Sequence, residues 1–166
     1  MRDLIVIMGV AGSGKSTVAA GLAEAAGWPF VEADDFHPSE NRAKMASGTP
    51  LSDGDRADWI DAITAHVARM PNDRVVLACS ALTAFVQQRL QRDSGRLCCF
   101  VWLDVPITDL RARLAARTEH FMPVSLLESQ LAALDVPSAA VRMDAGRPVG
   151  ELVKMLQRDL PAPDPA

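Results

Sequence analysis

The chain has 166 residues, of which 49% are hydrophobic and 23% charged, so it is long enough for one compact domain and too short for two ordinary ones. Its formal net charge is −4 and its pI is near 5.3, so it lacks the excess of basic residues that binding to a nucleic-acid backbone requires. We therefore expect no nucleic-acid partner. No stretch approaches the roughly 18 apolar residues that a membrane span requires, so we expect no membrane partner either.

Five short apolar runs alternate with segments of helical periodicity, which predicts an α/β fold of parallel strands joined by crossover helices. The predicted strands are residues 4–8, 29–32, 74–79, 97–103 and 139–143. The predicted helices are residues 16–26, 55–70, 84–92, 107–117, 124–134 and 149–160, with Asp53 capping the second and Gly27 ending the first. We expect a single domain over residues 1–160 and a frayed proline-rich tail over residues 161–166.

The cysteines and the N-terminus indicate the compartment. Cys79, Cys98 and Cys99 all lie in apolar runs, and an odd count with two adjacent residues is not typical of a disulfide framework. The apolar run at residues 4–8 leads directly into a glycine-rich stretch and has no full-length signal-peptide core. Together these features predict a protein of the reducing cytoplasm.

The glycine-rich stretch at residues 9–16 reads GVAGSGKS, the eight-position pattern of a Walker A phosphate loop between a strand and a helix. Glycines allow successive N–H groups to point inward, and the helix adds its positive N-terminal end to the same anion site. Lys15 is expected to act in catalysis by reaching the β- and γ-phosphates, and Ser16 to ligate Mg²⁺. The alternative is a glycine-rich turn that merely joins strand to helix. The residues expected to bind ATP here are Gly9, Ala11, Gly12, Ser13, Gly14, Lys15, Ser16 and Thr17.

Acidic side chains follow the second predicted strand, where residues 32–38 read EADDFHP. In open α/β sheets ligands bind at this carboxyl edge of the strands. A carboxylate there can accept a proton from an acceptor hydroxyl or hold magnesium-bound water. We predict Asp34 for this role and Asp35 as its substitute, because strand alternation leaves only one of the two pointing at the site. The alternative is that the pair caps the following loop.

A long polar connection, residues 41–56, precedes the helix that contains Trp59. Long structured loops at a ligand edge are more often functional than idle. An anionic acceptor requires a fixed cation, and the candidates are Lys44 and Arg56, of which arginine offers bidentate geometry toward a carboxylate. For either residue the alternative is a solvated surface charge.

These motifs together resemble the gluconate kinase family, and the resemblance covers nearly the whole chain. The stretch from His37 to Trp59 is its most specific part, because other P-loop kinases of this size lack it. The matching segments are GVAGSGKS at 9–16, DDFHP at 34–38, Asn41, KMASG at 44–48, Pro50-Leu51, Asp53, Asp55-Arg56, Trp59, CSAL at 79–82, HFM at 120–122, Leu127, Ser129-Gln130 and Leu134.

The resemblance implies a P-loop NTPase fold of the nucleoside/shikimate-kinase type, with a five-stranded parallel sheet flanked by helices and a lid at about residues 117–124. It implies ATP and Mg²⁺ as cofactors, and phosphorylation of the terminal hydroxyl of D-gluconate to 6-phosphogluconate. Arg113 and Arg117 match lid positions that close over the phosphates, Arg117 as a catalytic residue, while His37 and His120 match substrate contacts. Without the family, the arginines are equally one polar helix face. The family also tends to form homodimers.

The sequence departs from the family pattern after Leu82, where residues 83–89 read TAFVQQR in place of a basic residue and a Tyr-Arg-Asp triplet. This loss of charge near the acceptor edge leaves a kinase for another sugar acid or polyol as an alternative. Shikimate is a further alternative acceptor, disfavoured because the third strand ends in Cys79-Ser80 without a glycine-rich run. A nucleotide-binding regulator without transfer activity is the alternative from another functional class, and the retention of Asp34 argues against it.

Overall fold

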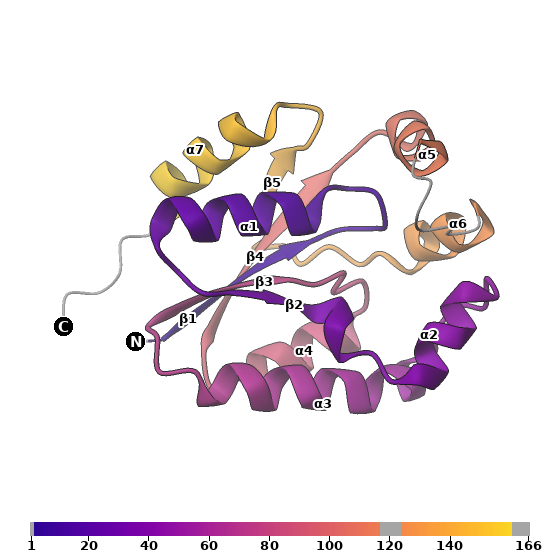
Figure 1. The fold of residues 1–166 in the computed structure, drawn as a ribbon, viewed down its shortest axis with the longest axis horizontal. Coiled ribbons are helices and arrows are strands. Elements are labelled where there is room, and N and C mark those ends of the chain that lie inside the picture. The colour runs from indigo at the N-terminus through magenta and orange to yellow at the C-terminus, as the bar shows by residue number, and fades with distance from the viewer. Residues whose placement is uncertain (1, 117–123, 161–166) are drawn as a thin grey trace.

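The computed structural model describes residues 2–116 and 124–160, which form a layered α/β structure (Figure 1). Residues 117–123 of the predicted lid, with Arg117 and His120, and the predicted tail 161–166 lie outside the described residues. In chain order the elements are β1 (Asp3–Met8), α1 (Lys15–Ala26), β2 (Phe30–Glu32), the 3-10 helix η1 (Ala33–Phe36), α2 (Ser39–Ala46), α3 (Asp53–Arg69), β3 (Arg74–Ala78), α4 (Ala84–Asp93), β4 (Leu97–Asp104), α5 (Ile107–Ala115), α6 (Val124–Ala133), β5 (Val141–Asp144) and α7 (Val149–Asp159).

The strands form one parallel sheet in the order β2-β3-β1-β4-β5, which confirms the predicted five-stranded parallel sheet flanked by helices. Helices α1 and α7 cover one face, and α3 and α4 cover the other (Figure 1). Because every strand runs the same way, the loops that follow the strands gather at one edge, where ligands bind in this class of fold.

Strand β1 shows why the central strands are apolar throughout. Ile5 and Ile7 pack into the core under α1 and α7, while Leu4 and Val6 pack into the core under α3 and α4. Successive side chains of a strand point to opposite faces, so a strand covered on both faces needs apolar residues at every position. The continuous apolar run at residues 4–8 therefore belongs to the middle of the sheet.

The helix ends follow the expected chemistry with one correction. Gly27 caps α1 in the left-handed conformation and donates its N–H to the carbonyls of Ala23 and Glu24, as predicted. The prediction that Asp53 caps α3 was wrong, because Ser52 is the cap: its hydroxyl accepts from the N–H of Asp55, and the Asp55 carboxylate accepts from the N–H of Ser52. This reciprocal capping box satisfies two backbone donors at once.

Two elements precede α3 where the sequence indicated only a strand end and a polar connection. Residues Ala33–Phe36 form the 3-10 turn η1, and Ser39–Ala46 form helix α2. The 107–117 prediction also ran past the end of α5 at Ala115. Helix α2 has no clear apolar stripe and buries only Asn41, whose side chain donates to the carbonyl of Asp55 at 2.7 Å. Its contacts are therefore tertiary, which is why hydrophobic periodicity missed it.

At the edge of the sheet opposite the site, the buried guanidinium of Arg96 holds the connection between α3 and β3. Arg96 is 6% exposed and donates to the backbone carbonyls of Val67 at 3.1 Å, Asn72 at 2.8 Å and Met70 at 2.7 Å. These carbonyls lie at the end of α3 and in the turn before β3, so one side chain fixes that connection. Across the described residues, no helix combines the length and apolarity of a bilayer span.

Candidate active site

A cavity of about 620 Å³ lies at the carboxyl edge of the sheet. It is lined by residues of the phosphate loop, of helices α2, α3 and α6, and of η1, which we call the acceptor turn because it carries Asp34. Its size is typical of a small-molecule site. Its polar lining residues are Ser16, Thr17, Ser80, Ser129, Gln130, Lys15, Asp34, His37, Arg42 and Arg56, and its other lining residues are Ala11, Gly12, Gly14, Met45, Ala46, Pro50, Leu51, Trp59, Leu82, Leu114, Leu126 and Ala133.

The phosphate loop depends on glycines at three positions. Gly9, Gly12 and Gly14 have φ values of 150°, 80° and 95°, which side chains disfavour. A Cβ at Gly9 would also lie 2.8 Å from the hydroxyl oxygen of Ser13, which is buried and has no hydrogen-bond partner within the described part of the chain. Gly14 caps α1 without a side-chain hydrogen bond, so the first N–H groups of the helix face the cavity edge as an anion site.

The side chains of Lys15, Ser16 and Glu32 lie close together beside this loop. Glu32 was not among the predicted site residues. The Glu32 carboxylate accepts hydrogen bonds from the Ser16 hydroxyl and from the N–H of Asp34, the latter at 3.4 Å. Burial raises the pKa of Glu32, and the Ser16 hydrogen bond opposes that rise. Lys15 donates to the carbonyl of Val10 at 3.1 Å and also acts electrostatically on Glu32.

The oxygen donors at the start of α1 and at the end of β2 fit magnesium. Ser16 supplies a hydroxyl and Glu32 a carboxylate, and hard oxygen ligands of this kind suit Mg²⁺. Within residues 2–116 and 124–160 no group of three or more His, Cys, Asp or Glu side chains could enclose a metal ion. Mg²⁺ is usually held by one or two protein oxygens together with phosphate oxygens and water.

The acceptor turn places the two predicted aspartates differently, although the reason is not strand alternation. Both residues lie in η1, a 3-10 turn, so the period-two argument does not apply to them. Asp34 lines the cavity and its side chain is 74% exposed, whereas Asp35 is exposed but does not line the cavity. A 3-10 helix has three residues per turn, so neighbouring side chains such as those of Asp34 and Asp35 point in different directions.

His37 also lines the cavity and is held by Trp59. The two rings are stacked with centroids 4.6 Å apart and an angle of 6° between their planes, and the His37 side chain is only 7% exposed. Trp59 is buried in the core and also lines the cavity; its indole N–H donates to the carbonyl of Ala33 at 2.7 Å. Burial lowers the pKa of His37, with Asp34 acting in the opposite direction.

The two predicted acceptor cations are separated by the structure. Arg56 lines the cavity with its side chain 15% exposed, and pairs with Asp53 at 3.0 Å. Lys44 lies on α2, does not line the cavity, and pairs with Asp55 of the α3 capping box. Lys44 therefore links α2 to α3, and of these two cations Arg56 is the one that lines the cavity.

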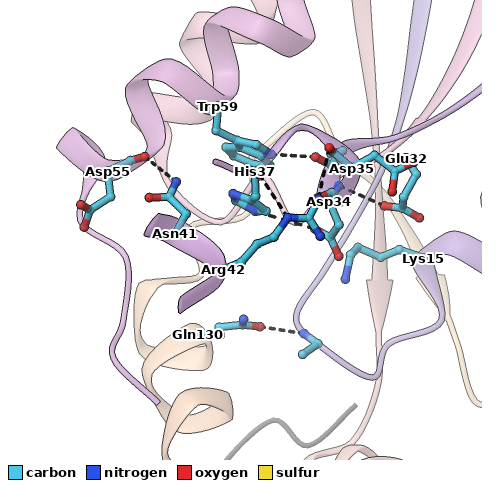
Figure 2. A network of polar contacts seen from close by, with 12 residues as sticks. Lys15, Glu32, Asp34, Asp35, His37, Asn41, Arg42, Asp55, Trp59 and Gln130 are labelled. Atoms are coloured by element: carbon cyan, nitrogen blue, oxygen red, sulfur yellow. Dashed lines mark hydrogen bonds and ion pairs between the residues drawn. The ribbon is translucent and has the colours of Figure 1, made fainter. Parts of the chain in front are cut away.

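Arg42 was missed as a site residue, although it lies in the segment that was singled out. It lines the cavity and donates to three carbonyls of the acceptor turn, an arrangement visible in Figure 2. Composition and periodicity gave no signal for it, because the turn that receives its hydrogen bonds and the helix that carries it were both unpredicted.

Gln130 connects the phosphate loop to α6. Its amide oxygen accepts from the N–H of Ala11 at 2.7 Å, and its side chain lines the cavity between the phosphate loop and the acceptor half (Figure 2). Arg113 approaches the loop from α5 and donates to the carbonyls of Gly12, Ser13 and Ala145 at 3.5, 3.3 and 2.7 Å. In this arrangement Arg113 supports the loop and does not line the cavity, while the roles expected for Arg117 and His120 stay predictions.

The residues that depart from the family pattern have internal partners in this chain. The Thr83 hydroxyl caps α4 and donates to Asp53 at 3.1 Å, so Asp53 holds both Thr83 and Arg56. The Gln87 side chain donates to the carbonyls of Ala81 and Asp135, at 2.9 and 2.6 Å.

Comparison with known proteins agrees with this geometry. The AAA domain family matches residues 4–137. The chain is 45% identical over 137 residues to a gluconokinase of Gluconobacter oxydans, covering 80% of this chain and 75% of that protein. It is 33% identical over 162 residues to the thermosensitive gluconokinase of Escherichia coli, covering 94% and 86%. The crystal structure of a gluconokinase from Sinorhizobium meliloti is 42% identical with a TM-score of 0.81, covering 93% of this chain and 90% of that one.

Proposed function

This chain belongs to the gluconokinase family of AAA-domain P-loop proteins, and we propose that it transfers the terminal phosphoryl group of ATP to the terminal hydroxyl of D-gluconate, giving 6-phosphogluconate. The observation that carries the proposal is that Lys15 of the phosphate loop and Asp34 of the acceptor turn line one cavity. Phosphoryl transfer needs mainly positioning and charge stabilisation, and the cavity offers a side for each reactant.

On the phosphate side, the loop N–H groups and the Lys15 ammonium hold the phosphates of ATP. Ser16 and Glu32 would hold Mg²⁺, which when bound would supply positive charge to offset the negative charge that develops on the phosphate. The raised pKa of Glu32 fits this role, because a carboxylate that is costly to ionise alone becomes favourable beside a cation.

On the acceptor side, Asp34 accepts the proton of the terminal hydroxyl while the hydroxyl oxygen bonds to the γ-phosphorus and the bond to ADP breaks. Its exposure to the cavity supports this role, since a base must reach its substrate. The His37 ring, packed on Trp59, forms the wall beside Asp34, with its Nε2 3.9 Å from a carboxylate oxygen of Asp34. A neutral His37 can contact acceptor hydroxyl groups without repelling Lys15.

The charge of the cavity favours a sugar acid over a neutral polyol. Among the described lining residues three side chains are cationic, Lys15, Arg42 and Arg56, and one is a carboxylate, Asp34. Lys15 is directed to ATP. Arg56 pairs with Asp53 through Nη1, and its guanidinium has further N–H donors for an acceptor carboxylate, which a polyol does not carry. We propose that Arg56 binds this carboxylate, because it is the predicted acceptor cation that lines the cavity.

The test measures ADP release with ATP, Mg²⁺ and a panel of gluconate, other aldonates, sorbitol and shikimate. We expect gluconate to be the preferred acceptor, and ³¹P NMR to show the phosphate on its terminal oxygen. Lys15→Ala and Asp34→Asn are each expected to lower kcat about 100-fold or more. Asp35→Asn, which removes the neighbouring carboxylate outside the cavity, is the matched control and is expected to keep wild-type turnover.

Two outcomes would contradict the proposal. ATP binding without acceptor-dependent ADP release from any compound would favour the nucleotide-binding regulator. A preference for sorbitol over gluconate would favour the polyol kinase and remove the role of Arg56.

A further inference from the structure

Arg42 connects helix α2 to the turn that carries the proposed base. Its Nη2 donates to the carbonyls of Asp34 at 3.1 Å and Asp35 at 3.2 Å, and its Nε donates to the carbonyl of His37 at 3.2 Å. Figure 2 shows the side chain reaching from α2 to the turn, with its guanidinium beside Asp34. One side chain therefore holds the middle of η1 and the residue that caps its C-terminal end, while it also lines the cavity.

The charge environment of Arg42 differs from that of the other cations on the acceptor side. Lys44 and Arg56 pair with Asp55 and Asp53, whereas Arg42 forms no ion pair within the described part of the chain. All three of its hydrogen bonds go to backbone carbonyls, so it holds the turn through the main chain. The planar guanidinium matches this set of acceptors, and the single ammonium of a lysine has no equivalent fork.

The Trp59 indole holds the start of η1 through the carbonyl of Ala33 at 2.7 Å, and the Asp34 carboxylate has the His37 ring as a neighbour at 3.9 Å, so Arg42 adds restraint at the middle and end of the turn. The Asp34 side chain is 74% exposed, and η1 is a single turn in which the N–H of His37 reaches the carbonyl of Asp34 only at 3.4 Å. The hydrogen-bond geometry of a 3-10 turn is poorer than that of an α-helix, so the three bonds from Arg42 restrain a turn that its own hydrogen bond holds weakly. A shift of about 1 Å in a reacting group can lower turnover by about 100-fold.

We propose that Arg42 is a positioning residue for phosphoryl transfer, which holds the acceptor turn so that the Asp34 carboxylate faces the phosphate loop. This inference rests on the proposed function, because it takes Asp34 to be the base. The proposed role requires the forked geometry of the guanidinium as well as its positive charge. Arg42→Lys keeps the charge and loses the fork, so the two properties can be tested separately.

The test compares Arg42→Lys and Arg42→Met with wild type and with Arg158→Met. Arg158 is an exposed arginine of α7 that pairs with its neighbour Asp159, so it is a matched control. We expect both Arg42 variants to lower kcat at least about ten-fold while KM for ATP stays within about two-fold, and Arg158→Met to behave as wild type. Hydrogen–deuterium exchange of the peptide covering residues 33–38 should rise in both Arg42 variants and stay unchanged in the control.

Wild-type kcat in Arg42→Lys would overturn the inference, because charge alone would then suffice. A raised KM for gluconate with unchanged kcat would also overturn it, since Arg42 would be a ligand and not a positioning residue. If the wild type shows no gluconate-dependent ADP release, the proposed function fails by itself. The exchange measurement still decides on Arg42 in that case, because unchanged exchange at residues 33–38 shows that it does not hold the turn.

Discussion

The amide oxygen of Gln130 accepts a hydrogen bond from the backbone N–H of Ala11 at 2.7 Å, which joins α6 to the phosphate loop across 119 residues of sequence. The bond brings a side chain of the helix after residue 123 to the place where the two halves of the cavity meet. The amide is neutral, so it can contact the loop without competing electrostatically with phosphate groups.

Changing Gln130 to Glu keeps an oxygen that can accept from Ala11 but adds a negative charge beside the phosphate site. We expect KM for ATP to rise about ten-fold, because like charges at short range repel by more than about 1 kcal/mol even in a partly solvated site. Steady-state kinetics with varied ATP measures this. The matched control is Gln157→Glu on α7, where the side chain donates to Ala25 outside the cavity and KM should not change. An unchanged KM in Gln130→Glu would place the phosphates away from α6.

Changing Glu32 to Gln is expected to stabilise the ligand-free protein at pH 7 and to lower its activity. The folded-state pKa of Glu32 is raised above 4.5 by burial, so the stability linked to this group is present below pH 4.5 and is lost as pH rises through the folded pKa. At pH 7 the wild type carries that cost and the amide does not. Differential scanning calorimetry at pH 7 should show a higher midpoint for Glu32→Gln, while kcat falls at least about ten-fold from the loss of a magnesium-side oxygen.

Glu24→Gln, on the exposed face of α1, is the control and should change neither quantity. A lower melting midpoint for Glu32→Gln would mean that the hydrogen bonds from Ser16 and Asp34 outweigh the cost of burial. Full activity in that variant would remove Glu32 from the magnesium side of the site.

His37 is expected to make stability depend on pH below its ordinary pKa of 6.5. Burial lowers the pKa of His37 in the folded state, so between the two pKa values the unfolded chain binds more protons. Its contribution is therefore complete above pH 6.5 and is lost as pH falls. Urea unfolding at pH 7.5 and pH 5.0 measures the loss, and His37→Phe, which keeps an aromatic ring against Trp59, should show a smaller one. An equal loss in both proteins would assign the dependence to other groups.

Arg96 is expected to contribute stability without affecting the site. Arg96→Met removes the donor to the carbonyls of Met70 and Asn72 and one of two donors to the carbonyl of Val67. Each carbonyl left unpaired costs about 1–3 kcal/mol, so the free energy of unfolding should fall by about 3 kcal/mol. Arg92→Met removes an exposed arginine that pairs with its neighbour Asp93, and should stay within about 0.5 kcal/mol of wild type. Chemical denaturation measures both, and equal values for the two variants would contradict the role of Arg96.

The sequence predicted the parts of the structure that depend on local spacing. Ile5, Ile7, Leu4 and Val6 lie where a strand covered on both faces requires apolar residues, and Gly27 ends α1 because few other residues adopt its conformation. Helix α2 and the turn η1 were missed, because the first is held by polar contacts such as that of Asn41 and the second is too short for a period.

The candidate site was predicted where a motif fixes both residue type and order. Lys15 and Asp34, which the motifs singled out, line the cavity, whereas Lys44 does not, although it looked equivalent to Arg56 in sequence; the roles of all four stay predictions. The difference lies in how α2 and α3 pack, since the same packing turns Lys44 toward Asp55 and leaves Arg56 facing the ligand space.

The sequence by itself determined that this chain has a phosphate loop between a buried strand and a helix, with an acidic turn after the next strand. These features follow from periodicity and from glycine chemistry, both of which act between near neighbours. Only the tertiary structure decided that Glu32 meets Ser16, that Gln130 meets Ala11, and that Arg42 holds the acceptor turn. Such contacts depend on how helices and loops pack at the edge of the sheet, because side chains far apart in sequence acquire partners only when the layers come together.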